Sequence, residues 1–414
     1  MKVVFNHPTG NANVKAILQG LFKAGYLSSF HTSIATYPSN IFGNFSKHKV
    51  FSEFKRRQFM SDMQTITIMY PFIELGRIVS LKTGLKFLTK HETGFFSIDR
   101  AYQYIDRKVA NYIRDHKSIH AVYAYEDGAL ETFKIAKNMG IKCIYDLPIA
   151  YWETSRKLMM EEAERLPNWA NTLKGGILDS EKKLARKSEE LELADMVVTP
   201  GSFVKNSLPQ WASKKNIIVS PFGSPINNCN INILVESSEK IANKKLRILF
   251  VGSMGQRKGL ADLFTAINLL NNPNIELVVM GSLQESLNFY KTECKYFLYE
   301  PGRSHQDVLE LMRSCDVFCL PSIVEGRALV MQEAMSQGLP LIITPNTGGE
   351  DLIIEGKTGF LIPIRSPEII AEKLQWFLDN KTSIPEMAIH AMEHAKNYTW
   401  EKYSDTIINA IKLN

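Results

Sequence analysis

Short β-rich runs alternate with helix-like stretches along most of the 414 residues. The runs fall at 2–5, 65–70, 121–125, 142–147, 196–200 and 216–221, and then at 246–252, 275–281, 316–322, 340–346 and 359–363. This alternation is typical of βαβ units, which build parallel sheets covered by helices. A polar segment rich in Asn and Ser, 226–245, separates the two series. The sequence therefore predicts an α/β protein with two Rossmann-like domains, 1–225 and 226–395.

The last segment, 396–414, has the apolar spacing of a single helix. Apolar residues recur three and four positions apart, and Thr399 precedes them as an N-cap. They are Trp400, Tyr403, Ile407, Ile408 and Ile411. We expect this C-terminal helix to cross back and pack on the first domain.

Composition narrows the class of protein. No apolar run reaches the roughly 18 residues of a membrane-spanning helix, and the N-terminus has no signal-peptide pattern. The five cysteines are scattered without a CxxC pair, which favours reduced thiols. A net charge of +6 is too mild to indicate nucleic acid, so none is expected as a partner. These features predict a cytoplasmic protein.

The stretch 246–270 reads as a buried strand, a glycine turn and an amphipathic helix. Its glycines have the spacing GxxGxxxG, which differs from the GxGxxG of dinucleotide-binding proteins. Arg257 and Lys258 stand at the expected helix start, where free amides also favour an anion. The pattern predicts a phosphate site, and the alternative is a turn with solvated cations.

A second anion site is predicted after the strand 316–322. A turn at 323–326 and a helix from about Arg327 would leave the amides of Gly326, Arg327 and Ala328 without intrahelical partners. Glu325 and Glu333 flank this helix start. Because carboxylates accept hydrogen bonds from hydroxyl groups, they suit the sugar and ribose of a nucleotide sugar. The alternative is a turn cap for Glu325 and an ion pair for Glu333.

Several motifs in this order resemble the retaining glycosyltransferases of family 4. They are "VGSMGQRKG", "GRSHQDVLELMRSCDVFCLPS" and "PSIVEGRALVMQEAMSQGLPLIITPNTGGEDLIIEGKTGFLIP" in the second domain, and "ELADMVVTPGSFVKNSL" with "SPFG" in the first. The similarity covers most of residues 118–365. It implies the GT-B fold, a nucleotide-sugar donor on the second domain, an acceptor on the first, and no cofactor or obligatory metal.

The resemblance also implies roles for individual residues. Lys258 and Arg257 would stabilise the leaving diphosphate, Glu325 would contact the donor sugar, and Glu333 would hold the ribose. Gly10, in "HPTGNAN", matches the family's glycine loop that approaches the phosphates from the opposite domain.

Two positions depart from the family pattern. Ser253 stands where relatives often have Arg, so the cations beside the donor reduce to the Arg257 and Lys258 pair. Asp146 ends the strand 142–147, where many relatives carry a catalytic histidine, and we expect it to contact the donor sugar or accept the acceptor's proton. A structural cap before Pro148 is the alternative. Glu126 and Asp127, at another strand end, rank second.

The expected activity is retaining transfer of a hexose-type sugar from a UDP-, GDP- or ADP-sugar. The acceptor would be a glycan, a lipid-linked sugar or a small molecule, in polysaccharide or glycoconjugate synthesis. Same-face attack would let the departing phosphate oxygen deprotonate the acceptor. A nucleotide-sugar epimerase of the same architecture and a non-catalytic nucleotide-sugar-binding protein are the alternatives.

Phenylalanines and cations are interleaved between residues 42 and 59. Such mixtures suit docking on an anionic membrane surface, where lipid-linked acceptors reside. The segment predicts peripheral contact with the inner face of the membrane, and a loop with an amphipathic helix closing the first domain is the alternative.

Overall fold

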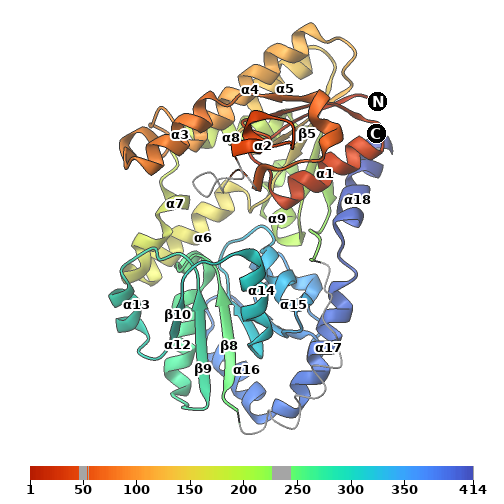
Figure 1. Ribbon diagram of the computed structural model, residues 1–414. Coiled ribbons are helices and arrows are strands. Elements are labelled where there is room, and N and C mark those ends of the chain that lie inside the picture. The colour runs from red at the N-terminus through yellow and green to blue at the C-terminus, as the bar shows by residue number, and fades with distance from the viewer. Residues whose placement is uncertain (46–53, 55, 226–243, 414) are drawn as a thin grey trace.

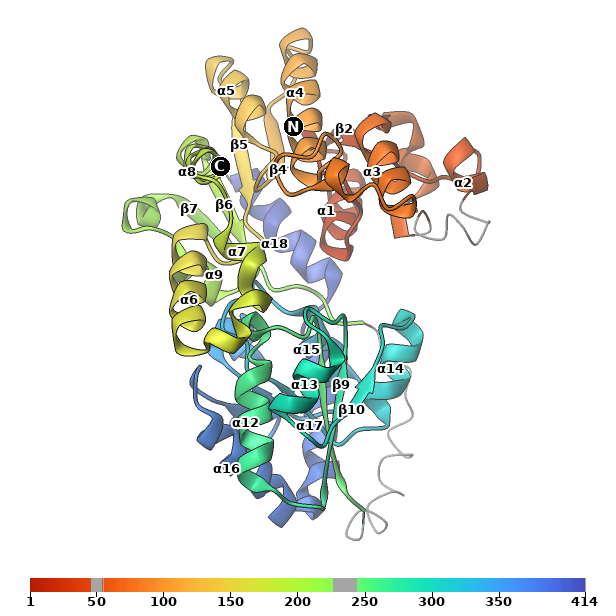
Figure 2. The same cartoon turned by 90° about the vertical axis from the view of Figure 1, so that its left-hand side faces the viewer.

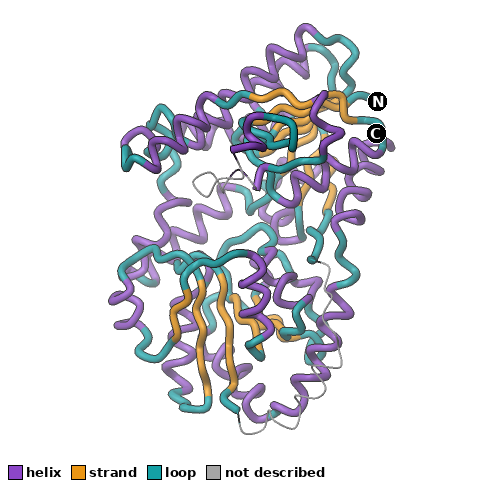
Figure 3. The backbone as a smooth tube through the Cα atoms, viewed as in Figure 1, coloured by secondary structure: helices purple, strands orange, loops and turns teal. Residues whose placement is uncertain are grey.

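The computed structural model describes residues 1–45, 54, 56–225 and 244–413, and it contains two parallel sheets stacked one above the other (Figures 1 and 3). The first has the order β3-β2-β1-β4-β5-β6-β7 and the second β10-β9-β8-β11-β12-β13. Helices flank both sheets, so each sheet has its own hydrophobic core. The predicted α/β architecture of two sheets is confirmed.

The strands of the first sheet are β1 Val3–Asn6, β2 Leu27–Thr32, β3 Thr67–Met69, β4 Ala121–Tyr125, β5 Lys142–Asp146, β6 Met196–Thr199 and β7 Asn216–Val219. Those of the second are β8 Leu246–Val251, β9 Ile275–Met280, β10 Leu298–Glu300, β11 Val317–Leu320, β12 Leu341–Ile343 and β13 Gly359–Leu361.

Two strands, β2 and β10, were not predicted. β2 buries polar side chains: Ser29 Oγ lies 3.0 Å from His31 Nε2, and His31 Nδ1 lies 3.0 Å from the Tyr70 hydroxyl. Because these groups satisfy one another, the strand is buried without an apolar pattern. β10 is a three-residue edge strand, too short to give a periodic signal.

The first-domain helices are α1 Ala12–Lys23, α2 Ile41–Phe45, α3 Phe72–Lys82, α4 Ile98–Asp115, α5 Leu130–Asn138, α6 Trp152–Arg165, α7 Lys174–Ile177, α8 Glu181–Leu193 and α9 Ser202–Ser207. They are followed by α12 Leu260–Leu270, α13 Leu287–Glu293, α14 His305–Arg313, α15 Leu329–Ser336, α16 Pro367–Asp379, α17 Ile384–Ala395 and α18 Trp400–Leu413. Short 3₁₀ helices include η4 Pro167–Leu173 and η6 Gln256–Lys258.

The C-terminal helix α18 returns to the first domain and packs on α1 (Figure 2). Thr399 Oγ1 accepts a hydrogen bond from the Lys402 amide at 3.1 Å, as expected of an N-cap. Tyr403 and Ile407 are buried in the core that includes β1 and α1. The predicted crossing is confirmed.

Conversely, a segment from the first half of the sequence packs against the second domain. Trp169 in η4 is buried in the core of the second sheet, and its Nε1 donates to Glu293 Oε2 at 2.9 Å. Arg165, at the end of α6, donates two hydrogen bonds to the Asp262 carboxylate, at 2.9 and 2.8 Å. Each sheet's core therefore includes a helical segment from the opposite half of the sequence: α18 packs into the core of the first sheet, and η4 packs into the core of the second.

The predicted membrane segment 42–59 is only partly described, since 46–53 and 55 lie outside the described residues, as does 226–243 of the predicted linker. Phe54 and Phe59 are buried, and Arg57 forms an ion pair with the buried Glu74. These three residues face inward, so the prediction is wrong for them. Within the described part of the chain, no helix has the length and apolar character needed to cross a bilayer. The four described cysteines are buried free thiols.

Candidate active site

A cleft of about 700 Å³ lies between the two sheets, at the carboxyl ends of their strands. Ligands of open α/β sheets bind at this edge. From the first domain it is lined by His7, Asn11, Asn13, Tyr102, Tyr125, Glu126, Asp127, Pro148 and Phe222. From the second it is lined by Val251, Gly252, Ser253, Arg257, Lys258, Met280, His305, Val308, Glu325, Arg327, Ala328, Leu329, Val330 and Glu333. Seven of the ten predicted site residues are among them; Gly10, Asp146 and Gly326 are not.

Arg257, Lys258 and Glu325 form the charged centre of the second-domain wall. Lys258 Nζ lies 2.5 Å and Arg257 Nη1 lies 2.7 Å from the same Glu325 oxygen, Oε1. Burial lowers the pKa of the Lys258 ammonium, Glu325 acts against this shift, and Arg257 adds to it. The trio has a net charge of about +1, so an anion entering the cleft would meet cations already oriented by a carboxylate.

The turn before α12 explains how the cations reach the cleft. Gly259 has φ +72°, and a Cβ there would lie 2.0 Å from the Pro321 carbonyl oxygen, so only glycine fits. The Gln256 side chain accepts from the Ala261 amide at 3.0 Å and so caps α12. The Ala261 amide is therefore already bonded, and the phosphate site at this turn stays a prediction that rests mainly on Arg257 and Lys258.

The second predicted helix starts later than expected. α15 begins at Leu329, and the Ala328 amide donates to the Thr347 carbonyl at 3.2 Å. The amides that helix geometry leaves without intrahelical acceptors are therefore those of Leu329 and Val330, and both residues line the cleft. The helix start lies two residues later than predicted, and the prediction of a free Ala328 amide is wrong.

Arg327 makes its contacts within the second domain, whereas Gly326 lies close against the first. The buried Arg327 guanidinium donates to the Gly348 carbonyl at 2.8 Å and to both oxygens of Asp351, at 2.7 and 3.1 Å. A Cβ on Gly326 would lie 1.7 Å from the Pro148 carbonyl oxygen of the first domain. Both predicted donor-binding residues thus have structural contacts that account for their identity.

Glu333 points from α15 toward His305, at the start of α14. Its Oε1 lies 2.9 Å from His305 Nε2, while Ser304 caps α14 by accepting from the Asp307 amide at 3.3 Å. Glu333 and His305 both line the cleft, on the far side of the helix start from Glu325. The sequence motifs gave no sign that His305 would reach Glu333.

Asp146 lies behind the cleft wall rather than in it. The Tyr123 hydroxyl donates to Asp146 Oδ2 at 2.6 Å, and the neighbouring Tyr125 lines the cleft. Burial raises the pKa of the Asp146 carboxyl to about 7, while the Tyr123 and Tyr125 hydroxyls act against this shift. Asp146 is therefore placed to orient the tyrosines.

The β1–α1 loop brings His7 and Asn11 to the cleft, and Asn13 reaches it from the first turn of α1. None of the three is among the predicted site residues. Burial lowers the pKa of His7 to about 4, which keeps the ring neutral near pH 7. A Cβ on Gly10 would lie 2.6 Å from the Phe59 ring, so Gly10 packs against that ring while its neighbour Asn11 faces the cleft. The signal was present in "HPTGNAN", a polar loop at a strand end.

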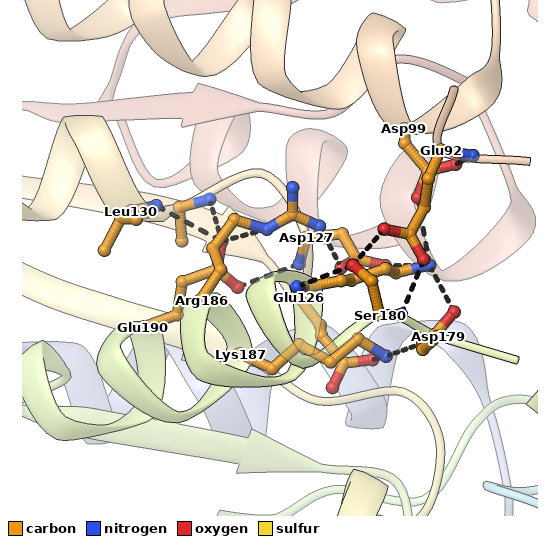
Figure 4. A network of polar contacts seen from close by, with 12 residues as sticks. Glu92, Asp99, Glu126, Asp127, Leu130, Asp179, Ser180, Arg186, Lys187 and Glu190 are labelled. Atoms are coloured by element: carbon orange, nitrogen blue, oxygen red, sulfur yellow. Dashed lines mark hydrogen bonds and ion pairs between the residues drawn. The ribbon is translucent and has the colours of Figure 1, made fainter. Parts of the chain in front are cut away.

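A network of charges follows β4 on the first-domain wall (Figure 4). Lys187 Nζ lies 3.3 Å from Glu126 Oε2, and Arg186 Nη2 donates to Asp127 Oδ1 at 2.5 Å. Burial raises the pKa of Glu126, and Lys187 partly offsets the rise. Its other oxygen, Oε1, is buried and finds no hydrogen-bond partner within the described chain.

At the outer end of this network, ligand atoms of His91, Glu92 and Asp179 lie within 4.8 Å of one another. Such a grouping has the composition of a metal site. However, Lys183 Nζ lies 3.0 Å from Asp179 Oδ1 and 2.9 Å from Asp99 Oδ1. Because an ammonium already bridges these carboxylates, the group serves as an ion-pair network.

Comparisons with known proteins match the second half of the chain most clearly. A sequence profile of the family "Glycosyl transferases group 1" matches residues 235–411. An uncharacterized glycosyltransferase of Methanocaldococcus jannaschii is 26% identical over 211 residues, which are 50% of this chain and 57% of the relative. The capsular polysaccharide biosynthesis glycosyltransferase CapM of Staphylococcus aureus is 25% identical over 183 residues, 43% and 47% of the two chains. The chain thus spans about half the length of the curated relatives it matches.

The fold extends the similarity over the whole chain. The crystal structure of Anabaena HepE in complex with UDP superimposes with a TM-score of 0.61, covering 100% of both chains at 13% sequence identity. At this identity the likeness establishes the fold of two facing sheets. Residues 235–411 therefore match the group 1 glycosyl transferases, and the chain as a whole has the GT-B fold of two facing sheets.

Proposed function

We propose that the protein transfers a hexose-type sugar with retention from a UDP-sugar to an acceptor held on its first domain. The observation that carries this proposal is the trio of the buried Lys258 and Glu325 with the partly exposed Arg257, in a cleft between two facing sheets. Oriented cations in a desolvated site are suited to stabilise a leaving diphosphate.

The donor diphosphate would bind Lys258, Arg257 and the amides at the start of α15. Its negative charge would compete with Glu325 for the cations, which frees a carboxylate oxygen to accept a hydroxyl of the donor sugar. Glu333, on the other side of the helix start, would accept from the ribose diol. HepE has also been crystallised with UDP-glucose, which supports uridine as the base and a hexose as the sugar.

The transfer exchanges one bond at the anomeric carbon. The bond from that carbon to the phosphate oxygen breaks, and the acceptor oxygen bonds to the same face of the sugar. The acceptor's proton passes to the leaving phosphate oxygen, so the products are UDP and the new glycoside. Since Lys258 and Arg257 supply the positive charge, we expect transfer to persist in EDTA.

Glu126 is our candidate for contact with the acceptor. It lines the first-domain wall of the cleft, one oxygen pairs with Lys187, and the other has no partner among the described residues. A buried carboxylate oxygen without a partner is costly, and a hydroxyl donor from the acceptor would satisfy it. The relatives' names, which include capsular polysaccharide biosynthesis, support a carbohydrate or lipid-linked acceptor in glycoconjugate synthesis.

The test compares three readouts with UDP-glucose: transfer to added acceptors, hydrolysis of the donor, and epimerisation of the donor alone. Our proposal predicts transfer or slow hydrolysis that Lys258→Ala and Glu325→Ala both abolish. Epimerisation without acceptor would support the epimerase alternative, and tight binding without turnover would support a binding protein. Near-wild-type transfer in both variants would refute the site assignment.

A further inference from the structure

Residues 72–95 of the first domain present many apolar side chains to solvent. They comprise α3, a turn, the 3₁₀ helix η3 Lys86–Thr89 and a loop, and we call them the α3–η3 lobe. Phe87 is 69% exposed, Phe72 59% and Phe95 58%, and these are the exposed phenylalanines among the residues whose side chains the structure describes. The lobe also exposes Val79, Leu81 and Leu85. Single exposed apolar side chains are ordinary, but six in one lobe indicate a surface that a partner covers.

Contacts within the lobe tie these side chains into one unit. The ring centroids of Phe72 and Phe95 lie 6.4 Å apart, and those of Phe96 lie 6.0 Å and 4.9 Å from them. Val79 follows Phe72 by about two helical turns, so both lie on the solvent face of α3. The Phe96 amide donates to the Leu88 carbonyl at 2.8 Å, which joins the aromatic cluster to η3. The exposed apolar surface is therefore built on ordered backbone.

The exposed charges of the lobe are all basic. Lys86 and Lys90 are exposed on either side of Phe87, and neither forms an ion pair within the described part of the chain. The two carboxylates of the lobe are turned inward: Glu74 is buried against two arginines, and Glu92 accepts from the N-cap amide of α8 at 2.8 Å. Lysine is depleted in interfaces between proteins but is favourable beside anionic headgroups. Charge therefore favours a lipid surface as the partner.

The lobe lies on the flank of the first domain opposite α18 (Figure 1). Its loop contacts the charge network that leads to the cleft, since His91 Nε2 lies 2.8 Å from Asp179 Oδ1. Asp179 Oδ2 lies 3.5 Å from Lys187 Nζ, which pairs with Glu126 on the cleft wall (Figure 4). A bilayer bound to the lobe would thus lie against the domain that holds the acceptor under the proposed function.

We propose that the α3–η3 lobe docks the protein on the surface of a bilayer that contains anionic lipids. Leu85 and Phe87 enter the boundary between headgroups and acyl chains, Lys86 and Lys90 contact lipid phosphates, and the aromatic cluster at Phe72 widens the inserted surface. This surface is distinct from the segment 42–59 that the sequence predicted. Docking goes beyond the proposed function, and only its benefit for a lipid-linked acceptor rests on that function.

The test is co-sedimentation of the full-length protein with vesicles of phosphatidylcholine, with or without added phosphatidylglycerol. We expect wild type to bind the anionic vesicles, to bind the neutral ones more weakly, and to lose affinity in high salt. Phe87→Ser should lower the partition coefficient at least about tenfold, because the ring no longer enters the bilayer. Lys86→Glu combined with Lys90→Glu should do the same, because two attractive charges become repulsive.

Matched controls separate the lobe from the rest of the surface. Leu269→Ser on α12 controls for Phe87→Ser, since Leu269 is 57% exposed in the second domain. Lys291→Glu combined with Lys357→Glu changes the net charge equally but away from the lobe, since both lysines are exposed in the second domain. Both controls should bind anionic vesicles as wild type does. The charge reversal tests the lobe independently if Phe87→Ser unfolds.

The docking proposal would be overturned if wild type failed to bind anionic vesicles, or if the lobe variants and their controls lost binding equally. A dimer that Phe87→Ser abolishes, with no vesicle binding, would assign the lobe to contact between copies of the chain and would also overturn it. The assay contains neither donor nor acceptor, so a failure of sugar transfer leaves its result standing.

Discussion

The two walls of the cleft are built differently. On the second domain, Lys258 and Arg257 share one oxygen of Glu325 and form a compact site. On the first domain, Glu126 and Lys187 belong to a wider network of ion pairs that also includes Asp127, Asp179 and Arg186 (Figure 4). Under the proposed function the second-domain wall would bind the donor and the first-domain wall the acceptor, so we call them the donor wall and the acceptor wall.

The largest predicted effect on activity comes from removing Lys258, the central cation of the donor wall. Lys258→Ala is expected to lower transfer about 10²–10³-fold, as for loss of one oriented group that stabilises developing charge. The exposed Lys357→Ala is the control, because Lys357 is outside the cleft. Steady-state rates at saturating donor measure the effect, and a loss of less than threefold would contradict the assigned role.

The acceptor wall is tested by Glu126→Gln. We expect the acceptor KM to rise about ten- to a hundredfold, because the acceptor loses a hydrogen bond to a charged group. Donor hydrolysis should change little, since Glu126 lies on the opposite wall from the cations. Glu131→Gln, exposed on α5, serves as the matched control for charge. If hydrolysis fell as much as transfer, the division between walls would be wrong.

Glu333→Ala probes the outer end of the donor wall. Loss of a hydrogen bond to ribose should weaken UDP binding about tenfold while leaving the acceptor KM unchanged. His305→Ala, which removes only the neighbour at 2.9 Å, should weaken UDP binding much less. Calorimetric titration with UDP and with uracil compares these effects, and an unchanged UDP affinity in Glu333→Ala would remove Glu333 from the site.

The smallest effect concerns stability and pH. Burial raises the pKa of Asp146 to about 7 from 3.8, so between these values the native protein holds a proton that the unfolded chain has released. The corresponding stability is present below the unfolded pKa and is lost as the pH rises through 7. An asparagine at position 146 does not titrate. The Tm of Asp146→Asn minus that of wild type should therefore increase as the pH is raised from about 4.5 to 8. A pH-independent difference in Tm would contradict the claim that the buried Asp146 carboxyl ionises in this pH range.

The sequence predicted the donor wall better than the acceptor wall for physical reasons. Lys258, Glu325 and Glu333 lie in local strand–turn–helix motifs, where spacing determines position. Lys187 lies in the charged helix α8 with no motif around it, and only the packing of α8 near the end of β4 brings it to Glu126. Asp146 was expected in the cleft because it ends a strand, but the Tyr123 hydroxyl holds it behind the wall.

Local competition for hydrogen bonds explains the remaining corrections. The Gln256 side chain accepts from the Ala261 amide, and the Thr347 carbonyl accepts from the Ala328 amide, so one amide at each of the two predicted sites is already bonded. No periodicity reveals a side-chain cap contributed within a 3₁₀ turn. Strand β2 was not predicted for a related reason: the polar side chains of Ser29 and His31 hydrogen-bond to each other inside the sheet, so the strand lacks an apolar pattern.

The most direct test of the central claim is a crystal structure of the protein with bound UDP. We predict the diphosphate within hydrogen-bond distance of Lys258 Nζ and the Leu329 amide, with the ribose hydroxyls on Glu333. A UDP molecule bound with full occupancy away from Lys258 and Glu333 would contradict the account.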